Sequence, residues 1–187
     1  MSALRRAFVA VVPPPPVLDA IDGLFDRTGR SKFRWTRRDQ WHVTIQYFGK
    51  VADADDLVGA LAGAVASVAS PRVQLVGAGA FPSPRSAAVF WLGVRDPEPL
   101  AAVHAAVAES AADFIRPRDR TSYVAHLTLA RCDSRRRITN EVEALASAAI
   151  GPVWTADDVV LFESETRRGG AMYREIARLP LAPESGV

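Results

Sequence analysis

The 187-residue sequence has only one cysteine and two methionines, and it contains no long apolar run. The single Cys132 excludes an intramolecular disulfide and a metal site built from several thiolates. No apolar stretch approaches the roughly 20 residues that a membrane-spanning helix needs. The first apolar segment ends at Pro13 and is too short for the hydrophobic region of a signal peptide. We therefore expect a cytoplasmic protein with no membrane partner.

Lysine is also scarce, since only Lys32 and Lys50 are lysines among 23 basic residues, and the formal net charge is +2. Codon bias in a GC-rich genome is one explanation of the arginine excess. Anion binding is another, because arginine binds phosphate bidentately whereas lysine acts as a point charge. Arginine clusters occur at Arg34/Arg37/Arg38, Arg116/Arg118/Arg120 and Arg135–Arg137. This composition permits nucleic-acid binding but does not demonstrate it.

Histidine is rare as well, and two of the three histidines share one sequence frame. The segments read His42-Val43-Thr44-Ile45 and His126-Leu127-Thr128-Leu129. Because residues i and i+2 of a β-strand point to the same face, each segment presents an imidazole beside a hydroxyl and turns its aliphatic residues to a core. Two histidines can act as acid and base near neutral pH, and hydroxyls can bind anionic oxygens. The repeat therefore predicts acid–base chemistry on a phosphate group.

Two plainer explanations compete with this hypothesis. The motifs can be unrelated strands whose His and Thr face solvent, since Thr, Val and Ile are ordinary strand residues. A metal site is the other explanation, but such sites usually need three or four His, Cys or carboxylate ligands, and neither motif has a carboxylate on the same face. The third histidine, His104, has no partner threonine and is expected to be a partly exposed helix residue. No metal and no other cofactor is predicted.

The rest of the chain mixes strands with helices. Apolar patterns predict strands over residues 8–12, 41–48, 73–76, 87–94, 124–131, 159–163 and 172–179. Helical spacing predicts helices over 17–29, 53–68 and 100–114. Thr139 is expected to cap a further helix, and the glycines and prolines from Gly77 to Pro84 predict a loop around Phe81.

This order of elements favours an α+β fold with largely antiparallel sheets, because strict strand–helix–strand alternation is rare in it. The two motif strands lie 84 residues apart, near half the chain length. This spacing predicts two similar lobes that each contribute one His/Thr strand to a shared cleft, although the two halves match poorly outside the motifs.

The pattern resembles that of the two-histidine (2H) phosphoesterases, in particular the bacterial RNA 2′,3′-cyclic phosphodiesterases, formerly called 2′-5′ RNA ligases. The similarity covers most of the chain. Its motifs lie at Phe8-Val9-Ala10, Trp41 to Gly49, Gly79 to Pro82, Val89 to Gly93, His126 to Arg131 and Leu161 to Ser164. Ala125 departs from the pattern, because the family commonly has proline before the second histidine.

This resemblance implies a bilobal fold of two pseudo-symmetric lobes around a central cleft, in a single domain over residues 1–187. It implies metal-free hydrolysis of RNA or nucleotide 2′,3′-cyclic phosphate ends to 2′-phosphomonoesters, with His42 as proton donor and His126 as proton acceptor. The symmetric motifs by themselves do not assign these two roles. Thr44 and Thr128 are then expected to donate to the phosphoryl oxygens. The expected partner is an RNA or oligonucleotide with a cyclic end, bound by a monomer.

Two further residues are candidates for substrate binding. Arg131 follows His126 by five residues, so an ideal strand would turn it to the opposite face. The family has an arginine near the phosphate at this position, which requires the strand to end or bulge before it. Phe81 could stack on a nucleobase or belong to the core. A non-catalytic RNA- or nucleotide-binding module and a low-efficiency 2′-5′ RNA ligase using the same site remain alternative functions.

Overall fold

The computed structural model of the protein describes residues 3–25, 33–117, 122–167 and 170–183. Its strands are β1 (Leu4–Val11), β2 (Phe33–Trp35), β3 (Val43–Val51), β4 (Arg72–Phe81), β5 (Ala87–Val94), β6 (His126–Arg136), β7 (Ala149–Thr155), β8 (Asp158–Arg167) and β9 (Gly170–Pro180). Its helices are α1 (Pro15–Asp22), α2 (Ala54–Val65), α3 (Glu98–Ser110) and α4 (Thr139–Glu143), with 3₁₀ turns η1 (Arg38–Gln40) and η2 (Ala112–Phe114).

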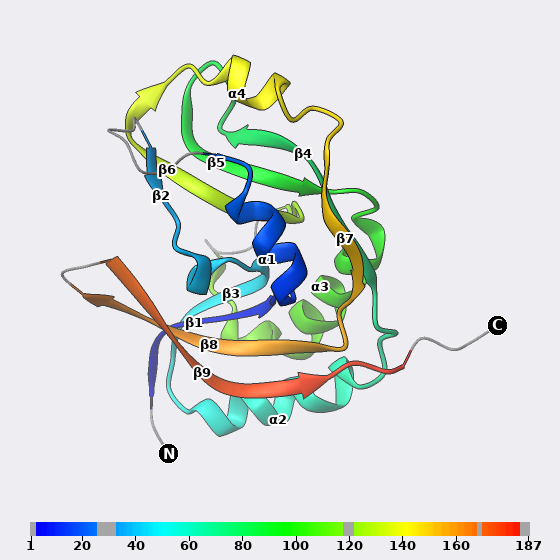
Figure 1. The fold of residues 1–187 in the computed structure, drawn as a ribbon. Helices are drawn as coiled ribbons and strands as arrows, with labels where there is room; N and C mark the ends of the chain where they lie inside the picture. Colours follow the sequence, from blue (N-terminus) through cyan, green and yellow to red (C-terminus); the bar gives the residue numbers. More distant parts are fainter. Residues whose placement is uncertain (1–2, 26–32, 118–121, 168–169, 184–187) are drawn as a thin grey trace.

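All nine strands belong to one antiparallel sheet. Its order is β7-β4-β5-β6-β3-β1-β8-β9, and β2 pairs with β6. The sheet forms two halves, with β4 to β7 in the upper half of the view and β1, β3, β8 and β9 in the lower half (Figure 1). The α+β class, the antiparallel pairing and the two-lobed arrangement predicted from the sequence are confirmed. No helix of the described residues is long and apolar enough to cross a membrane.

The two halves interlock through their helices. Helix α1 lies between β1 and β3 in sequence but packs against β7 of the upper half, and α3 lies between β5 and β6 but packs against α2 and β3 of the lower half. The contact of α1 is close because Gly151 has no side chain. A Cβ atom there would lie 3.1 Å from the Cα atom of Val17, which is fully buried. Each helix that precedes a histidine strand therefore crosses to the opposite half.

Local sequence explains where these helices begin. Prolines occupy the first turn of α1, where the missing N–H group would lack a helical partner in any case. Asp53 caps α2 by accepting a hydrogen bond from the Asp55 N–H group at 2.9 Å, and the acidic first turn complements the helix dipole. Leu57 and Leu61 then bury one apolar face. The helix predicted after Asp53 is thus confirmed.

The loop predicted from Gly77 to Pro84 is wrong up to Phe81, because β4 continues to that residue as a strand, and is confirmed from Pro82, where the turn before β5 begins. The glycines that suggested a loop instead make room for a neighbour. A Cβ atom on Gly79 would lie 2.2 Å from the ring of Trp91, its partner on β5, so only glycine leaves space for the indole. Two strands were missed, β2 and β7. The first has only three residues, and the second is an edge strand that contains Gly151 and Pro152.

Two predictions about helix ends also fail. Helix α1 ends at Asp22 rather than near Gly29, which lies outside the described residues. Thr139 does not cap α4, because it is the first helical residue and Ile138 occupies the cap position without a side-chain hydrogen bond. The Thr139 hydroxyl is instead buried with no hydrogen-bond partner among the described residues. The predicted strand over residues 87–94 is confirmed at both ends.

Candidate active site

The two halves of the sheet meet at Val43 and Leu127, which follow the two motif histidines and are antiparallel partners. Both side chains are fully buried. One register step away on either side, each histidine lies opposite the threonine of the other strand. Because alternate side chains point to opposite faces, the two histidines and two threonines share the face turned away from this core.

That face lines one cavity of about 750 Å³ between the halves. It contains five of the six site residues predicted from the sequence: His42, Thr44, His126, Thr128 and Arg131. The other lining residues are Arg6, Phe8, Arg34, Trp35, Thr36, Arg37, Gln40, Tyr47, Ser164, Ala171 and Tyr173. The shared cleft expected from the spacing of the motifs is therefore present.

His42 is held on several sides. Its Nδ1 atom lies 2.7 Å from the Gln40 carbonyl oxygen, which can only accept, so Nδ1 carries the proton and Nε2 faces the Thr44 hydroxyl at 3.0 Å. The rings of Phe8 and Tyr173 lie 4.9 and 5.3 Å from the imidazole. Burial is the main cause that lowers the pKa of His42 to about 4, and it outweighs the opposing effect of the Gln40 carbonyl.

His126 repeats this arrangement on the other strand. Its Nδ1 atom donates to the Val124 carbonyl oxygen at 2.7 Å, again two residues earlier in the chain. Phe81 packs edge-on against the imidazole, with ring centroids 5.0 Å apart. Burial lowers the pKa of His126, and the positive charge of Arg131 acts in the same direction. Both rings are therefore held in the same tautomer, with Nε2 unprotonated in the neutral form.

A bulge in β6 explains how Arg131 reaches the cavity. Along β5, Phe90 pairs with Ala130 but the next residue, Trp91, pairs with Thr128, so one residue of β6 is left over. The extra residue shifts the alternation of side chains and turns Arg131 to the face of Thr128. The sequence required such a bulge for Arg131 to lie near the histidines.

The same irregularity occurs in β3. Along β1, Val9 pairs with Gln46 but Ala10 pairs with Thr44. Tyr47 therefore occupies on β3 the position that Arg131 occupies on β6, and it also lines the cavity. No local pattern in the sequence marks this bulge, which is why Tyr47 was missed.

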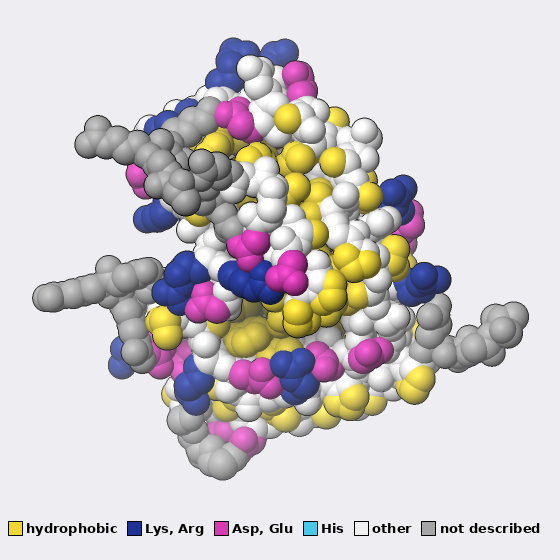
Figure 2. All heavy atoms as spheres, in the orientation of Figure 1, with side chains coloured by type: hydrophobic (Ala, Val, Ile, Leu, Met, Phe, Trp, Pro, Cys, Tyr) yellow, Lys and Arg dark blue, Asp and Glu magenta, His cyan; other side chains and the backbone are white. Residues whose placement is uncertain are grey.

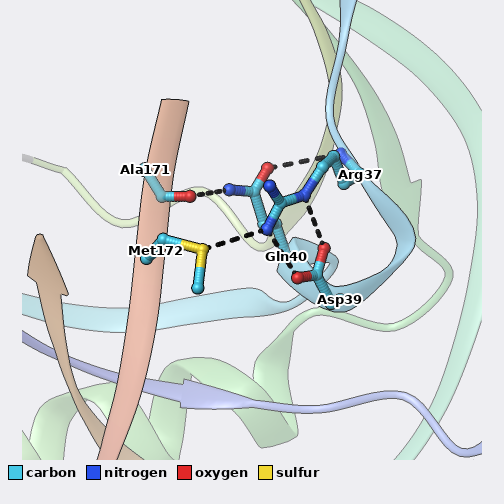
Figure 3. Close-up of polar contacts among 5 residues, drawn as sticks. All are labelled: Arg37, Asp39, Gln40, Ala171 and Met172. Carbon is cyan, nitrogen blue, oxygen red and sulfur yellow. Dashed lines mark hydrogen bonds and ion pairs between the residues drawn. The ribbon is translucent and has the colours of Figure 1, made fainter. Parts of the chain in front are cut away.

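The turn that precedes His42 is tied to β9 across the edge of the cavity (Figure 3). The Gln40 side chain donates to the Ala171 carbonyl oxygen and accepts from the Arg37 N–H group. Arg37 binds Asp39 through two hydrogen bonds and contacts the Met172 sulfur at 3.4 Å. Because the Gln40 carbonyl also fixes His42, these contacts couple the tip of β9 to the histidine.

The sequence did not indicate several of these contacts. The carbonyls of Gln40 and Val124 belong to the backbone, which any residue supplies, so no residue type marks them. Tyr173 reaches His42 only because β9 folds back beside β8. Phe8 lies in the opening strand that was recognised, but its packing on His42 follows from the pairing of β1 with β3.

Phe81 lines a second cavity of about 360 Å³ that adjoins the first at Thr44, Tyr47 and His126. The third histidine, His104, also lies there, stacked on Tyr123 with ring centroids 4.5 Å apart. Its Nδ1 atom donates to the Ile45 carbonyl oxygen at 2.8 Å, since that oxygen can only accept. His104 is a partly exposed helix residue, as predicted.

Within the described ranges, no group of three or more His, Cys, Asp and Glu side chains is arranged to hold a metal ion. The basic side chains are largely interspersed with acidic ones on the face drawn in Figure 2, rather than gathered in one patch. On this face, therefore, anion binding would depend on local positioning of basic groups and not on a uniformly basic surface.

Comparisons with known proteins agree with this geometry. The sequence profile of the 2′-5′ RNA ligase superfamily matches residues 13–168. The chain is 24% identical over 180 residues to a protein of Methanothermobacter thermautotrophicus named RNA 2′,3′-cyclic phosphodiesterase, covering 91% of this chain and 96% of that one.

Two solved structures share the fold. TT0787 of Thermus thermophilus has a TM-score of 0.81 at 19% identity, and the match covers 96% of this chain and 99% of that one. LigT of E. coli, crystallised with 3′-AMP, has a TM-score of 0.73 at 23% identity over 95% of this chain and 98% of that one.

Proposed function

The chain belongs to the 2′-5′ RNA ligase superfamily, and on that premise we propose that it hydrolyses 2′,3′-cyclic phosphate ends of RNA or nucleotides to 2′-phosphomonoesters. The membership agrees with the two-histidine phosphoesterase resemblance found in the sequence. The observation that carries the proposal is the pairing of Val43 with Leu127, which places both histidines and both threonines on one side of one cavity. The relative named RNA 2′,3′-cyclic phosphodiesterase supports the choice of reaction.

Hydrolysis needs one base and one acid on opposite sides of the phosphorus. A water oxygen forms a new bond to phosphorus while the bond from phosphorus to O3′ breaks. In the proposal, Nε2 of His126 takes the proton from the water and Nε2 of His42 returns a proton to O3′. The phosphate then remains on O2′. Both Nε2 atoms are available for these transfers, because each Nδ1 atom is committed to a backbone carbonyl.

The donor role of His42 requires a change in its protonation when substrate binds. A pKa of about 4 leaves this ring neutral at pH 7 in the free protein. An anionic phosphate within the same partly desolvated cavity favours the charged imidazole and raises that pKa. Substrate binding itself is then the event that loads the proton onto His42.

The remaining polar groups stabilise the phosphoryl oxygens. The hydroxyls of Thr44 and Thr128 lie beside the two histidines and can donate to those oxygens. Arg131 supplies the positive charge, and its planar guanidinium can hold a phosphate bidentately. Phe81 packs against His126 and lines the second cavity, not the main one. Its proposed role is therefore to hold the histidine in place. It can stack on a base only if the ligand extends into the second cavity.

The substrate class in this proposal is an RNA or oligonucleotide with a cyclic phosphate end, acted on by a monomer whose single bilobal domain spans residues 1–187. The structure of E. coli LigT with 3′-AMP supports a nucleotide-sized ligand for this fold. The reaction needs no metal and no cofactor.

Purified protein incubated in EDTA with an RNA ending in a 2′,3′-cyclic phosphate tests the proposal. The expected product is an RNA with a 2′-phosphate, identified by its resistance to an enzyme specific for 3′-phosphates. Activity that is lost in EDTA and restored by a divalent ion would contradict the metal-free mechanism. Binding without turnover would favour a non-catalytic RNA-binding module, and a 2′-5′ linked product formed with an added 5′-hydroxyl RNA would reveal ligase activity in the same site.

A further inference from the structure

The short strand β2 places Arg34 directly opposite Arg131 of β6. Directly opposed residues of an antiparallel pair point to the same face, with Cβ atoms about 4.5–5.5 Å apart. Both arginines are exposed and line the main cavity. Because like charges in this position repel, the arrangement is favourable only when negative charge lies against both side chains.

Nearby arginines have their charge neutralised within the protein, but these two do not. Arg37 is paired with Asp39 at 2.7 Å, and Arg38 is paired with two aspartates of α1. Neither Arg34 nor Arg131 forms an ion pair with a residue in the described part of the chain. The described residues therefore supply no counterion to either arginine, and a bound anion is suited to this role.

The two arginines lie on different strands of the site. Arg131 follows His126 and Thr128 on β6, and its charge lowers the pKa of both motif histidines, whereas Arg34 lies beside Arg131 on the neighbouring strand β2. The cavity of about 750 Å³ extends from the histidines to Trp35 on β2, and this volume lies in the range of roughly 300–1,000 Å³ that holds whole small molecules. It has room for more than one phosphate group.

We propose that Arg34 binds a second phosphate of the substrate, namely the 5′-phosphate or phosphodiester of the nucleotide that carries the cyclic phosphate. This inference rests on the proposed function. Arg131 then holds the reacting phosphate and Arg34 the next anion along the chain, which removes the repulsion between them. The consequence is a preference for ends of RNA chains over isolated nucleoside 2′,3′-cyclic phosphates.

The test compares adenosine 2′,3′-cyclic phosphate with the same nucleotide carrying a 5′-phosphate. In the unmodified protein the 5′-phosphate should raise kcat/KM by about tenfold or more, as expected for a charge-assisted hydrogen bond. Arg34→Gln should reduce this gain to less than about threefold, mainly through KM. Arg34→Lys should retain an intermediate gain, because it keeps the charge but loses the bidentate geometry.

Arg135→Gln is the matched control. It removes the same charge from another exposed residue of β6 that lines neither cavity. The gain from the 5′-phosphate should stay as in the unmodified protein. Repeating the series in high salt separates a local contact from general attraction, because screening weakens the latter.

A binding experiment makes the inference independent of turnover. Calorimetry with adenosine 2′-phosphate and adenosine 2′,5′-bisphosphate should show that the 5′-phosphate tightens binding about tenfold, and that Arg34→Gln removes most of this gain. If the unmodified protein binds the two ligands with nearly equal affinity, the inference is overturned. Equal losses for both ligands in Arg34→Gln overturn it as well, because Arg34 would then serve the reacting phosphate. Absence of hydrolysis with the gain in binding preserved would instead refute the proposed function alone.

Discussion

The histidine strands of the two halves, β3 and β6, begin alike and then diverge. In both, the Nδ1 atom of the histidine binds the carbonyl two residues earlier, and in both a register shift follows the threonine. Each imidazole also lies against two aromatic rings, Phe8 and Tyr173 at His42 and Phe81 and Trp91 at His126. His42, however, is bonded to Thr44 and its bond to the backbone is part-buried, whereas the bond of His126 to the backbone is exposed.

The position after the bulge differs more strongly, because β3 carries Tyr47 where β6 carries Arg131. At this position after the bulge, a positive charge thus lies on β6 and not on β3. The comparison teaches that two similar strands present two similarly held imidazoles, and that in the proposed mechanism the neighbours of each imidazole distinguish the acid from the base. Single substitutions at corresponding positions of β3 and β6 should therefore lower the rate of hydrolysis by unequal amounts, except at the two histidines.

The largest effects are expected at these histidines. His42→Ala and His126→Ala should each lower kcat by roughly 10²–10⁴, the usual contribution of a positioned acid or base. Steady-state hydrolysis of a cyclic-phosphate RNA measures the loss, and thermal melting checks that the fold is retained. His104→Ala is the control, because this third histidine lies outside the main cavity. Near-normal turnover in either motif variant would refute the acid–base pair.

The pH dependence should be the next largest effect. In the proposed mechanism the reactive form has His42 protonated and His126 neutral. Burial lowers the pKa of both rings below the usual 6.5, that of His42 to about 4. The population of this form in the free enzyme peaks between the two pKa values and falls about tenfold per pH unit above them.

The kcat/KM profile should therefore peak below pH 6.5 and fall roughly a hundredfold over the next two pH units. The kcat profile, which reports the complex, should peak at higher pH, because bound phosphate raises the pKa of His42. Rates measured from pH 4 to 9 with buffers of constant ionic strength decide this. A kcat/KM maximum at or above pH 7 would contradict the pKa of His42 in the free protein.

The sequence predicted the strands that show strong patterns and failed where tertiary packing decided the conformation. Gly79 suggested a loop, but its missing side chain accommodates Trp91 inside a regular strand. Gly151 and Pro152 hid the edge strand β7, whose glycine is needed for the approach of α1. Such close approaches join residues far apart in the chain, so no local pattern reveals them.

The site was predictable to the extent that side-chain type and strand alternation determine it. The two His/Thr pairs followed from a period of two, and Arg131 followed from the family resemblance together with a required bulge. Gln40 and Tyr173 were not assigned to the site, and Arg34 was named only within an arginine cluster that could bind anions. They reach it through a backbone carbonyl, a returning hairpin and a three-residue strand, and none of these has a sequence signature.

Replacement of Arg131 on β6 should lower kcat/KM less than the pH change does. Arg131→Lys should lower kcat/KM roughly 10-fold to 30-fold, because an ammonium group cannot reproduce bidentate contact with a phosphate. The loss should persist in high salt. Arg135→Ala, in the same strand, should change kcat/KM little, and any loss should fade as salt is added. Equal and salt-sensitive losses would mean that Arg131 only contributes to a basic surface.

The threonines should matter less, since each supplies one hydroxyl among several donors. Thr44→Ala and Thr128→Ala should each lower kcat/KM about 3-fold to 10-fold, the range of one neutral hydrogen bond. Of the two motif threonines in the described structure, only Thr44 is hydrogen-bonded to a motif histidine, at 3.0 Å from His42 Nε2. Thr44→Ala should therefore also shift the pH profile, and Thr128→Ala should not. A shift in both variants would show that the two halves are more equivalent than their contacts indicate.

The smallest effect is expected at Tyr47, the counterpart of Arg131. Its side chain lines both cavities and is 38% exposed, so its hydroxyl can reach a ligand as a neutral donor. Tyr47→Phe removes only this hydroxyl and should lower kcat/KM about 2-fold to 5-fold, less than Arg131→Lys, because a neutral donor stabilises an anion less than a guanidinium does. Tyr47→Ala, which also removes the ring, separates ring contact from hydrogen bonding in the same assay. If Tyr47→Phe impaired hydrolysis as much as Arg131→Lys, the asymmetry between β3 and β6 would not govern the chemistry, and the two positions would act as equal partners on the phosphate.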